Sequence, residues 1–174
     1  MKPQIPLATL AIALIALAGC ATPVAPTGRA EIRPASGSKV AGVALFAQTD
    51  DGVRIFAKVS GLAPGEHGFH VHEAGDCSAP DAMSAKGHFN PTNMPHGHVM
   101  SGHHAGDMPN LRAEAGGIAE YTEHVEGMVL TGHPHGIAGR AVIVHADADD
   151  YISQPAGNSG KRVGCGVIVL DAVK

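Results

Sequence analysis

Histidine is concentrated in one segment of this chain, residues 67–107, and that segment most constrains what the chain can fold into. It holds eight of the 12 histidines of the 174-residue sequence and ends in Asp107. Imidazole is the commonest metal ligand among protein side chains. The segment therefore predicts a metal site.

One pair of these histidines has the spacing of a strand. The sequence contains three His-x-His pairs, where chance alone gives about one, so this spacing by itself is weak evidence. At His70 and His72, however, the apolar residues Phe69 and Val71 alternate with the histidines, which is the period of a β-strand. Because residues i and i+2 of a strand point to one face, both imidazoles could bind one metal while the apolar residues face a core.

Much of the remaining chain has the pattern of short strands. Residues 40–48 and 53–60 are apolar-rich and flank an Asp-Gly turn, which is a strong hairpin signal. Further strands are predicted at residues 67–72, 116–124, 127–131, 138–145 and 163–170, without a long amphipathic helix. This pattern favours an all-β antiparallel sandwich or barrel. Residues 73–110 have no strand pattern, and a loop of this length is usually functional.

The N-terminus has the features of an export signal. Lys2 precedes an apolar run that is too short for a confident membrane-spanning helix. Leu17-Ala18-Gly19-Cys20 matches the processing box of bacterial lipoproteins, in which the cysteine carries lipid. The alternative is a plain secretory signal with an incidental cysteine. We therefore expect a lipoprotein signal peptide at 1–19, a flexible tether at 20–28 and one domain at 29–174.

The expected location is the periplasm, with the protein anchored to a membrane through lipid on Cys20. Ala21 is not the aspartate that commonly retains lipoproteins in the inner membrane, so the outer membrane is favoured. Without residues 1–19 the chain has 11 basic and 16 acidic residues, a formal charge of −5, and no basic run. Nucleic acid is therefore not an expected partner.

Cysteine usage agrees with export. If Cys20 carries lipid, Cys77 and Cys165 remain to pair, and a disulfide persists in an oxidising compartment. The alternative, two free buried thiols, fits an exported chain poorly.

Several short motifs follow one another in a fixed order, namely His67-Gly-Phe-His-Val-His72, Gly87-His-Phe-Asn-Pro91, His104-Ala-Gly-Asp107, Val144-His145 and Gly160-Lys-Arg-Val-Gly-Cys-Gly-Val167. This set resembles the copper/zinc superoxide dismutases over roughly residues 28–172. The resemblance implies a flattened eight-stranded antiparallel Greek-key barrel with a long metal-binding loop. That barrel is an immunoglobulin-like sandwich architecture of which this family is a standard member. One copper and one zinc per chain, with superoxide as substrate, are implied as well.

The resemblance also assigns the ligands. Copper would be bound by His70, His72, His88 and His145, and zinc by His88, His96, His104 and Asp107. Four imidazoles suit Cu(II), and four protein ligands around zinc are typical of a structural site. His88 would bridge both metals and exchange a proton during the reaction. His98 and His103 are alternatives to their neighbours, although the family spacing favours His96 and His104.

Two further residues have implied roles. Asp149 would accept hydrogen bonds from one copper ligand and one zinc ligand; the alternative is a solvated acid in the run 147–150. Arg162 would be catalytic together with His88, guiding an anion to the copper. His67 would be a structural histidine bonded to backbone, and no ligand role is expected for His124, His133 and His135.

The implied activity is dismutation of superoxide to molecular oxygen and hydrogen peroxide, which would protect the cell envelope. The main alternative is a periplasmic copper or zinc storage protein without turnover, which would need no anion guide such as Arg162. A catalytically inert relative would typically lack a copper ligand, and here all four are present. The oligomeric state stays open, with a homodimer as one expectation.

Overall fold

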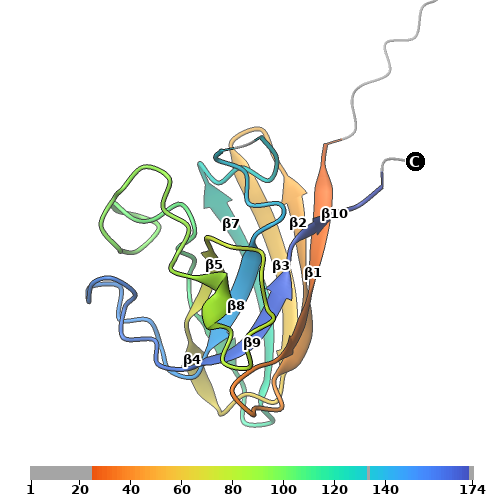
Figure 1. Cartoon of the computed structure of the whole chain (residues 1–174), viewed down its shortest axis with the longest axis vertical. Coiled ribbons are helices and arrows are strands. Elements are labelled where there is room, and N and C mark those ends of the chain that lie inside the picture. Colours follow the sequence, from red (N-terminus) through yellow and green to blue (C-terminus); the bar gives the residue numbers. More distant parts are fainter. Residues whose placement is uncertain (1–24, 133, 173–174) are drawn as a thin grey trace, which may run out of the picture.

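The computed structural model describes residues 25–132 and 134–172, and strands dominate this part of the chain (Figure 1). The strands are β1 (Thr27–Pro34), β2 (Ala41–Gln48), β3 (Gly52–Ser60), β4 (Gly65–His67), β5 (Phe69–His72), β6 (Leu111–Ala113), β7 (Ile118–Glu126), β8 (Ala141–His145), β9 (Arg162–Val167) and β10 (Val169–Leu170). Helical structure in these residues is limited to one 3-10 turn, η1 (Met83–Ala85). None of the described helices is long and apolar enough to cross a membrane. The predicted all-β class is confirmed.

The strands form one antiparallel sheet that curls into a nearly closed barrel. Hydrogen-bonded neighbours run in the order β4-β6-β7-β3-β2-β1-β9-β8-β5, and β10 pairs with β1. The two ends of this path, β4 and β5, are consecutive in sequence and are separated only by Gly68. A single segment therefore belongs to both ends of the sheet. When β4 is counted with β5 and β9 with β10, the barrel has the eight strands that were predicted.

Alternation of side chains builds the core. β2 and β3 pair as the predicted hairpin. Ala44 and Phe46 of β2 and the inward residues of β3 are buried, while the outward residues are half-buried or exposed. Phe69 and Val71 of β5 are fully buried in the same core, as the strand alternation predicted. Removal of these apolar side chains from water is the main driving force for this fold, and it fixes which face of β5 carries the histidines.

One predicted strand does not form. Residues 127–131 follow the end of β7 as a loop, because Gly127 has a φ of +75° and turns the chain away from the sheet. The N–H of Leu130 donates to the side chain of Gln48 (2.7 Å) instead of to a strand partner. The apolar run at residues 128–130 predicted a strand, but the Leu130 N–H does not take part in strand pairing.

The start of the domain also differs from the prediction. β1 begins at Thr27, and Gly28 pairs with Phe46 of β2 and Leu170 of β10. The last two residues of the tether predicted at 20–28 therefore belong to the barrel. The predicted signal peptide and Cys20 lie outside the described residues.

Two long loops leave the barrel on the same side. Residues 73–110, green in Figure 1, follow β5, and residues 146–161, blue, connect β8 with β9. Because β5 pairs directly with β8, both loops start from adjacent strands. This arrangement positions the candidate site.

Candidate metal centre

Four buried histidines converge where β5 and β8 pair. His70 and His72 lie on β5, His145 ends β8, and His88 comes from the loop that follows β5. None is more than 9% exposed. One ring nitrogen of each lies within 4.8 Å of the corresponding atoms of the others. We call these four residues the barrel group.

Backbone carbonyls orient two of these rings. Nδ1 of His72 donates to the carbonyl oxygen of Lys86 (2.8 Å), and Nδ1 of His145 lies 3.4 Å from the carbonyl oxygen of Gly160. A ring nitrogen that donates a hydrogen bond leaves its lone pair on the other nitrogen. Nε2 of both histidines is thereby available as a ligand atom.

The inner nitrogens of the barrel group have no hydrogen-bond partner among the described residues. These buried atoms are Nδ1 of His70 and Nε2 of His72, His88 and His145. Buried polar atoms are nearly always paired, because an unpaired one costs free energy. Four converging nitrogens that lack partners fit a bound metal ion, and an all-nitrogen set suits copper.

A second group shares His88 with the first. It consists of His88, His96, His104 and Asp107, all buried, and we call it the loop group. The Asp107 carboxylate lies 2.8 Å from Nδ1 of His88, 3.0 Å from Nδ1 of His96 and 3.3 Å from Nδ1 of His104. Three nitrogens and one oxygen form a donor set found in tetrahedral zinc sites. His88 presents Nδ1 to this group and Nε2 to the barrel group.

Asp149 connects one histidine of each group. Its carboxylate accepts hydrogen bonds from Nε2 of His70 (2.7 Å) and from Nε2 of His96 (2.9 Å). The side chain is fully buried, and the backbone N–H of Tyr151 donates a further bond to it (2.7 Å). A carboxylate in this position fixes the tautomer and the orientation of both rings.

Burial keeps the barrel group neutral. It lowers the pKa of His72 and of His145 well below the ordinary histidine value, and neighbouring imidazoles lower both further. Burial also lowers the pKa of His88 to about 4, although its hydrogen bond to Asp107 opposes the shift. Because a histidine must be deprotonated to bind a metal, these lone pairs are available at neutral pH.

Negative charge dominates the loop group. Burial lowers the pKa of His96, but hydrogen bonds to Asp107 and Asp149 outweigh burial and raise that pKa to about 9. Burial raises the pKa of both carboxyl groups, yet hydrogen bonds from the histidines outweigh it and hold each pKa well below its usual range. The carboxylates that favour a proton on His96 equally favour a metal cation in its place.

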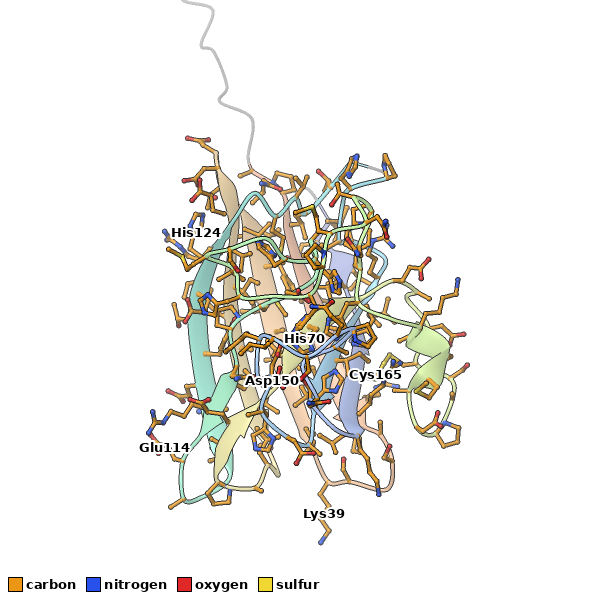
Figure 2. The ribbon with its side chains drawn as sticks, turned by 90° about the vertical axis from the view of Figure 1, so that its left-hand side faces the viewer. Lys39, His70, Glu114, His124, Asp150 and Cys165 are labelled. Carbon is orange, nitrogen blue, oxygen red and sulfur yellow. A yellow bond between two sulfur atoms is a disulfide. The ribbon has the colours of Figure 1, made fainter. Side chains whose placement is uncertain are left out.

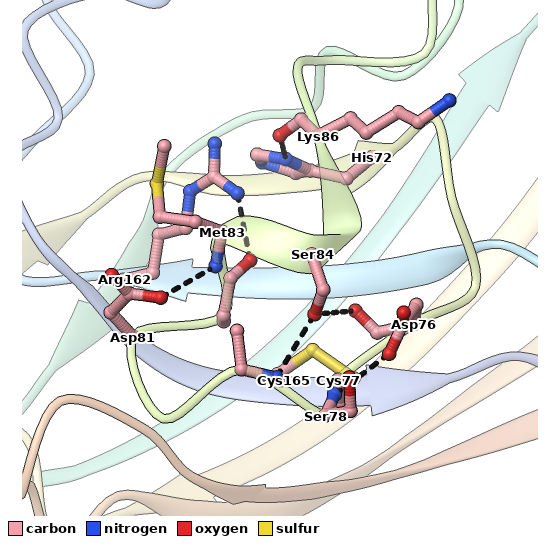
Figure 3. Close-up of a disulfide and its surroundings, with 12 residues drawn as sticks. His72, Asp76, Cys77, Ser78, Asp81, Met83, Ser84, Lys86, Arg162 and Cys165 are labelled. Atoms are coloured by element: carbon pink, nitrogen blue, oxygen red, sulfur yellow. Dashed lines mark hydrogen bonds between the residues drawn. A yellow bond between two sulfur atoms is a disulfide. The ribbon is translucent and has the colours of Figure 1, made fainter.

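The predicted disulfide is present. Cys77 and Cys165 are bonded with their Cα atoms 5.8 Å apart, and the bridge ties the loop after β5 to β9 (Figure 3). Within that loop the Ser84 hydroxyl donates to the carbonyl of Asp76 (2.8 Å) and accepts from the N–H of Ala79 (3.1 Å). The disulfide and these bonds hold residues 76–85 against the strand that begins with Arg162.

Arg162 lies at the edge of the barrel group. It is the β9 residue opposite His145, and its Nη1 donates to the carbonyl oxygen of Ala82 (2.8 Å), as Figure 3 shows. Together with Lys161 and Met83 it lines a cavity of about 360 Å³. A fixed guanidinium in an open cavity can receive an anion.

The two histidines that the sequence offered as alternatives to His96 and His104 lie outside both groups. His98 is half-buried and packs its ring edge-on against Tyr151, with ring centroids 4.7 Å apart. Nδ1 of His103 lies 2.6 Å from the carbonyl oxygen of His104. The loop group therefore contains His96 and His104 and neither of their histidine neighbours.

The remaining histidines also stay apart from the two groups. Both ring nitrogens of His67 lie within hydrogen-bonding distance of backbone carbonyl oxygens, those of His145 (3.0 Å) and Ala63 (2.9 Å). His124 lies beside Asp51 at the outer edge of the barrel, well away from His70 in Figure 2. His135 is exposed, and His133 lies outside the described residues.

The sequence did not predict which backbone and side-chain atoms hold the site in place. The carbonyls of Lys86, Gly160 and Ala82 are main-chain atoms, which any residue type supplies, so no sequence signal marks them. Gln154 was also missed, although its side chain bonds to the backbone of His96. An exposed glutamine 58 residues away in sequence carries no pattern that links it to a ligand.

Known proteins resemble the chain over most of its length. Residues 40–168 match the family model described as copper/zinc superoxide dismutase (SODC). A Cu-Zn superoxide dismutase of Deinococcus radiodurans is 39% identical over 166 residues, which cover 88% of this chain and 90% of that protein. One from Aquifex aeolicus is 41% identical, with coverages of 80% and 85%. One from Arabidopsis thaliana is also 41% identical, with coverages of 85% and 95%. The chain therefore belongs to the copper/zinc superoxide dismutase family.

Proposed function

We propose that this protein converts superoxide into molecular oxygen and hydrogen peroxide, with copper in the barrel group and zinc in the loop group. The observation that carries the proposal is the convergence of four buried, unpartnered imidazole nitrogens in the barrel group. One of these imidazoles, His88, also faces the carboxylate of the loop group. The family uses copper and zinc, and this chain has a donor set suited to each.

The protein residues provide geometry, charge and a proton. When bound, copper supplies the one-electron chemistry, taking an electron from one superoxide and giving it to a second. Two superoxide ions and two protons yield one oxygen and one hydrogen peroxide. The chain must therefore admit an anion twice and deliver protons for the peroxide.

His88 is the ligand suited to hold a proton. Its Nε2 belongs to the barrel group, while its Nδ1 stays 2.8 Å from Asp107 in the loop group. A ring held through Nδ1 can take up and release a proton at Nε2 without turning.

Arg162 is suited to guide the substrate. Removing residues 1–19 leaves a formal charge of −5, so the mean field of the protein repels superoxide. Positive charge focused at the mouth of a site can still raise the rate of capture. The guanidinium is fixed by the carbonyl of Ala82 and lies in a cavity lined by two basic side chains, Arg162 and Lys161, and one acidic side chain, Asp81. A storage protein would have no need of this arrangement.

The decisive experiment follows superoxide decay with purified protein whose copper and zinc contents have been measured. We expect one copper and one zinc per chain and activity far above the free-metal background. Fully loaded protein without that activity would favour the storage function instead.

The zinc assignment has its own test. His96→Ala should lower zinc content because it removes a nitrogen of the loop group, whereas His98→Ala should leave zinc content unchanged. The reverse result would reassign the site to His98. Both variants are compared with the wild type by metal analysis after identical loading.

We also propose that the protein is exported to the periplasm and anchored by lipid on Cys20, with the outer membrane favoured. The support is the sequence Leu17-Ala18-Gly19-Cys20 after an apolar run, and acyl chains on that cysteine would hold the protein in a bilayer. Cys20→Ser should give a soluble or unprocessed form. A wild-type protein that fractionates as soluble would contradict the anchor.

Sedimentation of the purified domain decides between a monomer and a homodimer.

A further inference from the structure

Gln154 makes an unusual contact with a residue of the loop group. Its Oε1 accepts a hydrogen bond from the backbone N–H of His96 (2.9 Å), and its Nε2 donates to the backbone carbonyl of the same residue (2.9 Å). A side-chain amide has the same donor and acceptor as a peptide unit. Gln154 therefore pairs with His96 as a neighbouring strand would.

His96 has no other main-chain partner in the part of the chain that the structure describes. It lies in a segment without regular structure, and apart from the two bonds to Gln154 its N–H and C=O make no hydrogen bond there. His70 and His72, in contrast, are held by the β5–β8 ladder. The side chain of Gln154 provides for His96 what strand pairing provides for the barrel group.

The rest of the 146–161 loop surrounds the same histidine. Asp149 binds its Nε2 (2.9 Å). A Cβ atom added to Gly157 would collide with the Asp149 carboxylate and lie 2.7 Å from Nε2 of His96, so that backbone packs directly on this pair. His96 is thus fixed at its ring by Asp149 and at its main chain by Gln154.

We propose that Gln154 is a positioning residue for the metal ion in the loop group, which it serves by locking the main chain of His96. This inference rests on the proposed function, because it takes His96 to be a zinc ligand. Gln154 is itself exposed, and within the part of the chain that the structure describes its side chain makes no hydrogen bond to another member of either group. Its contribution acts through His96 alone, and it links the loop that leads into Arg162 to the loop that binds zinc.

The test compares zinc affinity in the full mature protein, measured by competition with a chelator. Gln154→Ala should weaken zinc binding about tenfold, the lower end of the cost of removing a group that orients a ligand. Copper affinity should not change, because the barrel group is held by strands. Co(II) bound in place of zinc should show an altered absorption spectrum in the variant, since the position of one ligand changes.

Two further variants make the test specific. Gln154→Glu keeps the acceptor for the His96 N–H but turns a carboxylate oxygen toward the His96 carbonyl, so it should lose affinity as well. Asn158→Gly is the matched control. Asn158 is an amide on the same loop that bonds to Asp150 and Ser153 and not to His96, and its φ of +53° suits glycine. This variant should bind zinc as the wild type does.

The outcomes separate the inference from the proposed function. If zinc does not bind the wild type, or still binds His96→Ala with wild-type affinity, the zinc assignment itself is rejected. If those controls succeed and Gln154→Ala keeps wild-type zinc affinity and Co(II) spectrum, only the role of Gln154 is rejected. The melting temperature is also compared between the wild type and Gln154→Ala, in the metal-free and in the zinc-loaded state. If the substitution lowers it equally in both states, Gln154 has a general structural role and the inference is rejected.

Discussion

The two ligand groups meet at His88 but are anchored in different ways. The barrel group takes three of its four histidines from β5 and β8, and backbone carbonyls orient the rings of His72 and His145. The loop group takes all of its residues from one long loop, and side chains hold His96 in place. Strand ladders fix most of the barrel group. In the loop group, His88 and Asp107 form isolated β-bridges to β5, whereas contacts between the two loops fix His96.

This difference predicts unequal preorganisation. Core strands are the parts of a protein that open least often, whereas loops open at a much lower cost. The barrel group should keep its geometry whether or not the loop group binds its metal. The loop group should depend on Asp149, Gln154 and the metal ion together. Each of the following predictions tests that asymmetry.

The largest effect is expected from His145→Ala, which removes one nitrogen of the barrel group. Activity should fall by more than about 100-fold, because loss of a ligand exceeds the 10- to 100-fold cost of losing a partner of a ligand. Copper content should fall while zinc content stays at the wild-type level, since His145 is not part of the loop group. Metal analysis and superoxide decay measure both. Loss of zinc along with copper would show that the groups are not anchored independently.

Asp149→Asn should have an intermediate effect that differs between the groups. An amide of the same size can accept a hydrogen bond from only one of the two rings, because its NH₂ group opposes the other N–H. Zinc affinity should fall roughly 10- to 100-fold. Copper affinity should fall less, since His70 remains on β5 while His96 has no strand. Equal losses in competition measurements for both metals would contradict the comparison.

The smallest of the three effects is expected for substrate capture at the entrance to the barrel group, and it should change the content of neither metal. Arg162→Glu should slow superoxide capture about tenfold or more, a magnitude taken from the general range of electrostatic steering, for which superoxide dismutases are a standard example. Copper content should not change. Added salt should slow the wild type more than the variant, because salt screens an attraction that the variant lacks. The rate is measured at low and high ionic strength.

Lys39→Glu is the matched control for Arg162→Glu. It makes the same change in net charge at an exposed residue at the end of the barrel, far from His70 in Figure 2. Its rate should stay close to that of the wild type. Equal slowing by both variants would assign the effect to overall charge. An Arg162→Glu protein with full copper and the wild-type rate at low salt would remove Arg162 from the capture step.

Much of the fold followed from local patterns. The alternation at Phe69 and Val71, the hairpin between β2 and β3 and the length of the loop after β5 were all predictable. The error at residues 127–131 shows where such patterns stop, because an apolar run does not reveal where its N–H groups find acceptors. Leu130 uses the side chain of Gln48, which lies 82 positions away in sequence.

The sequence by itself determined which residue types could bind metals and, through the order of its motifs, the family to which the chain belongs. It could not decide between His96 and His98 or between His103 and His104 on residue type, because both members of each pair are histidines. The tertiary structure brings His96 and His104 to Asp107 and turns their neighbours away. The carbonyls of Lys86 and Gly160 orient His72 and His145, and the side-chain amide of Gln154 bonds to the backbone of His96. Only the closed barrel and its two loops bring such distant backbone and amide groups within hydrogen-bonding distance.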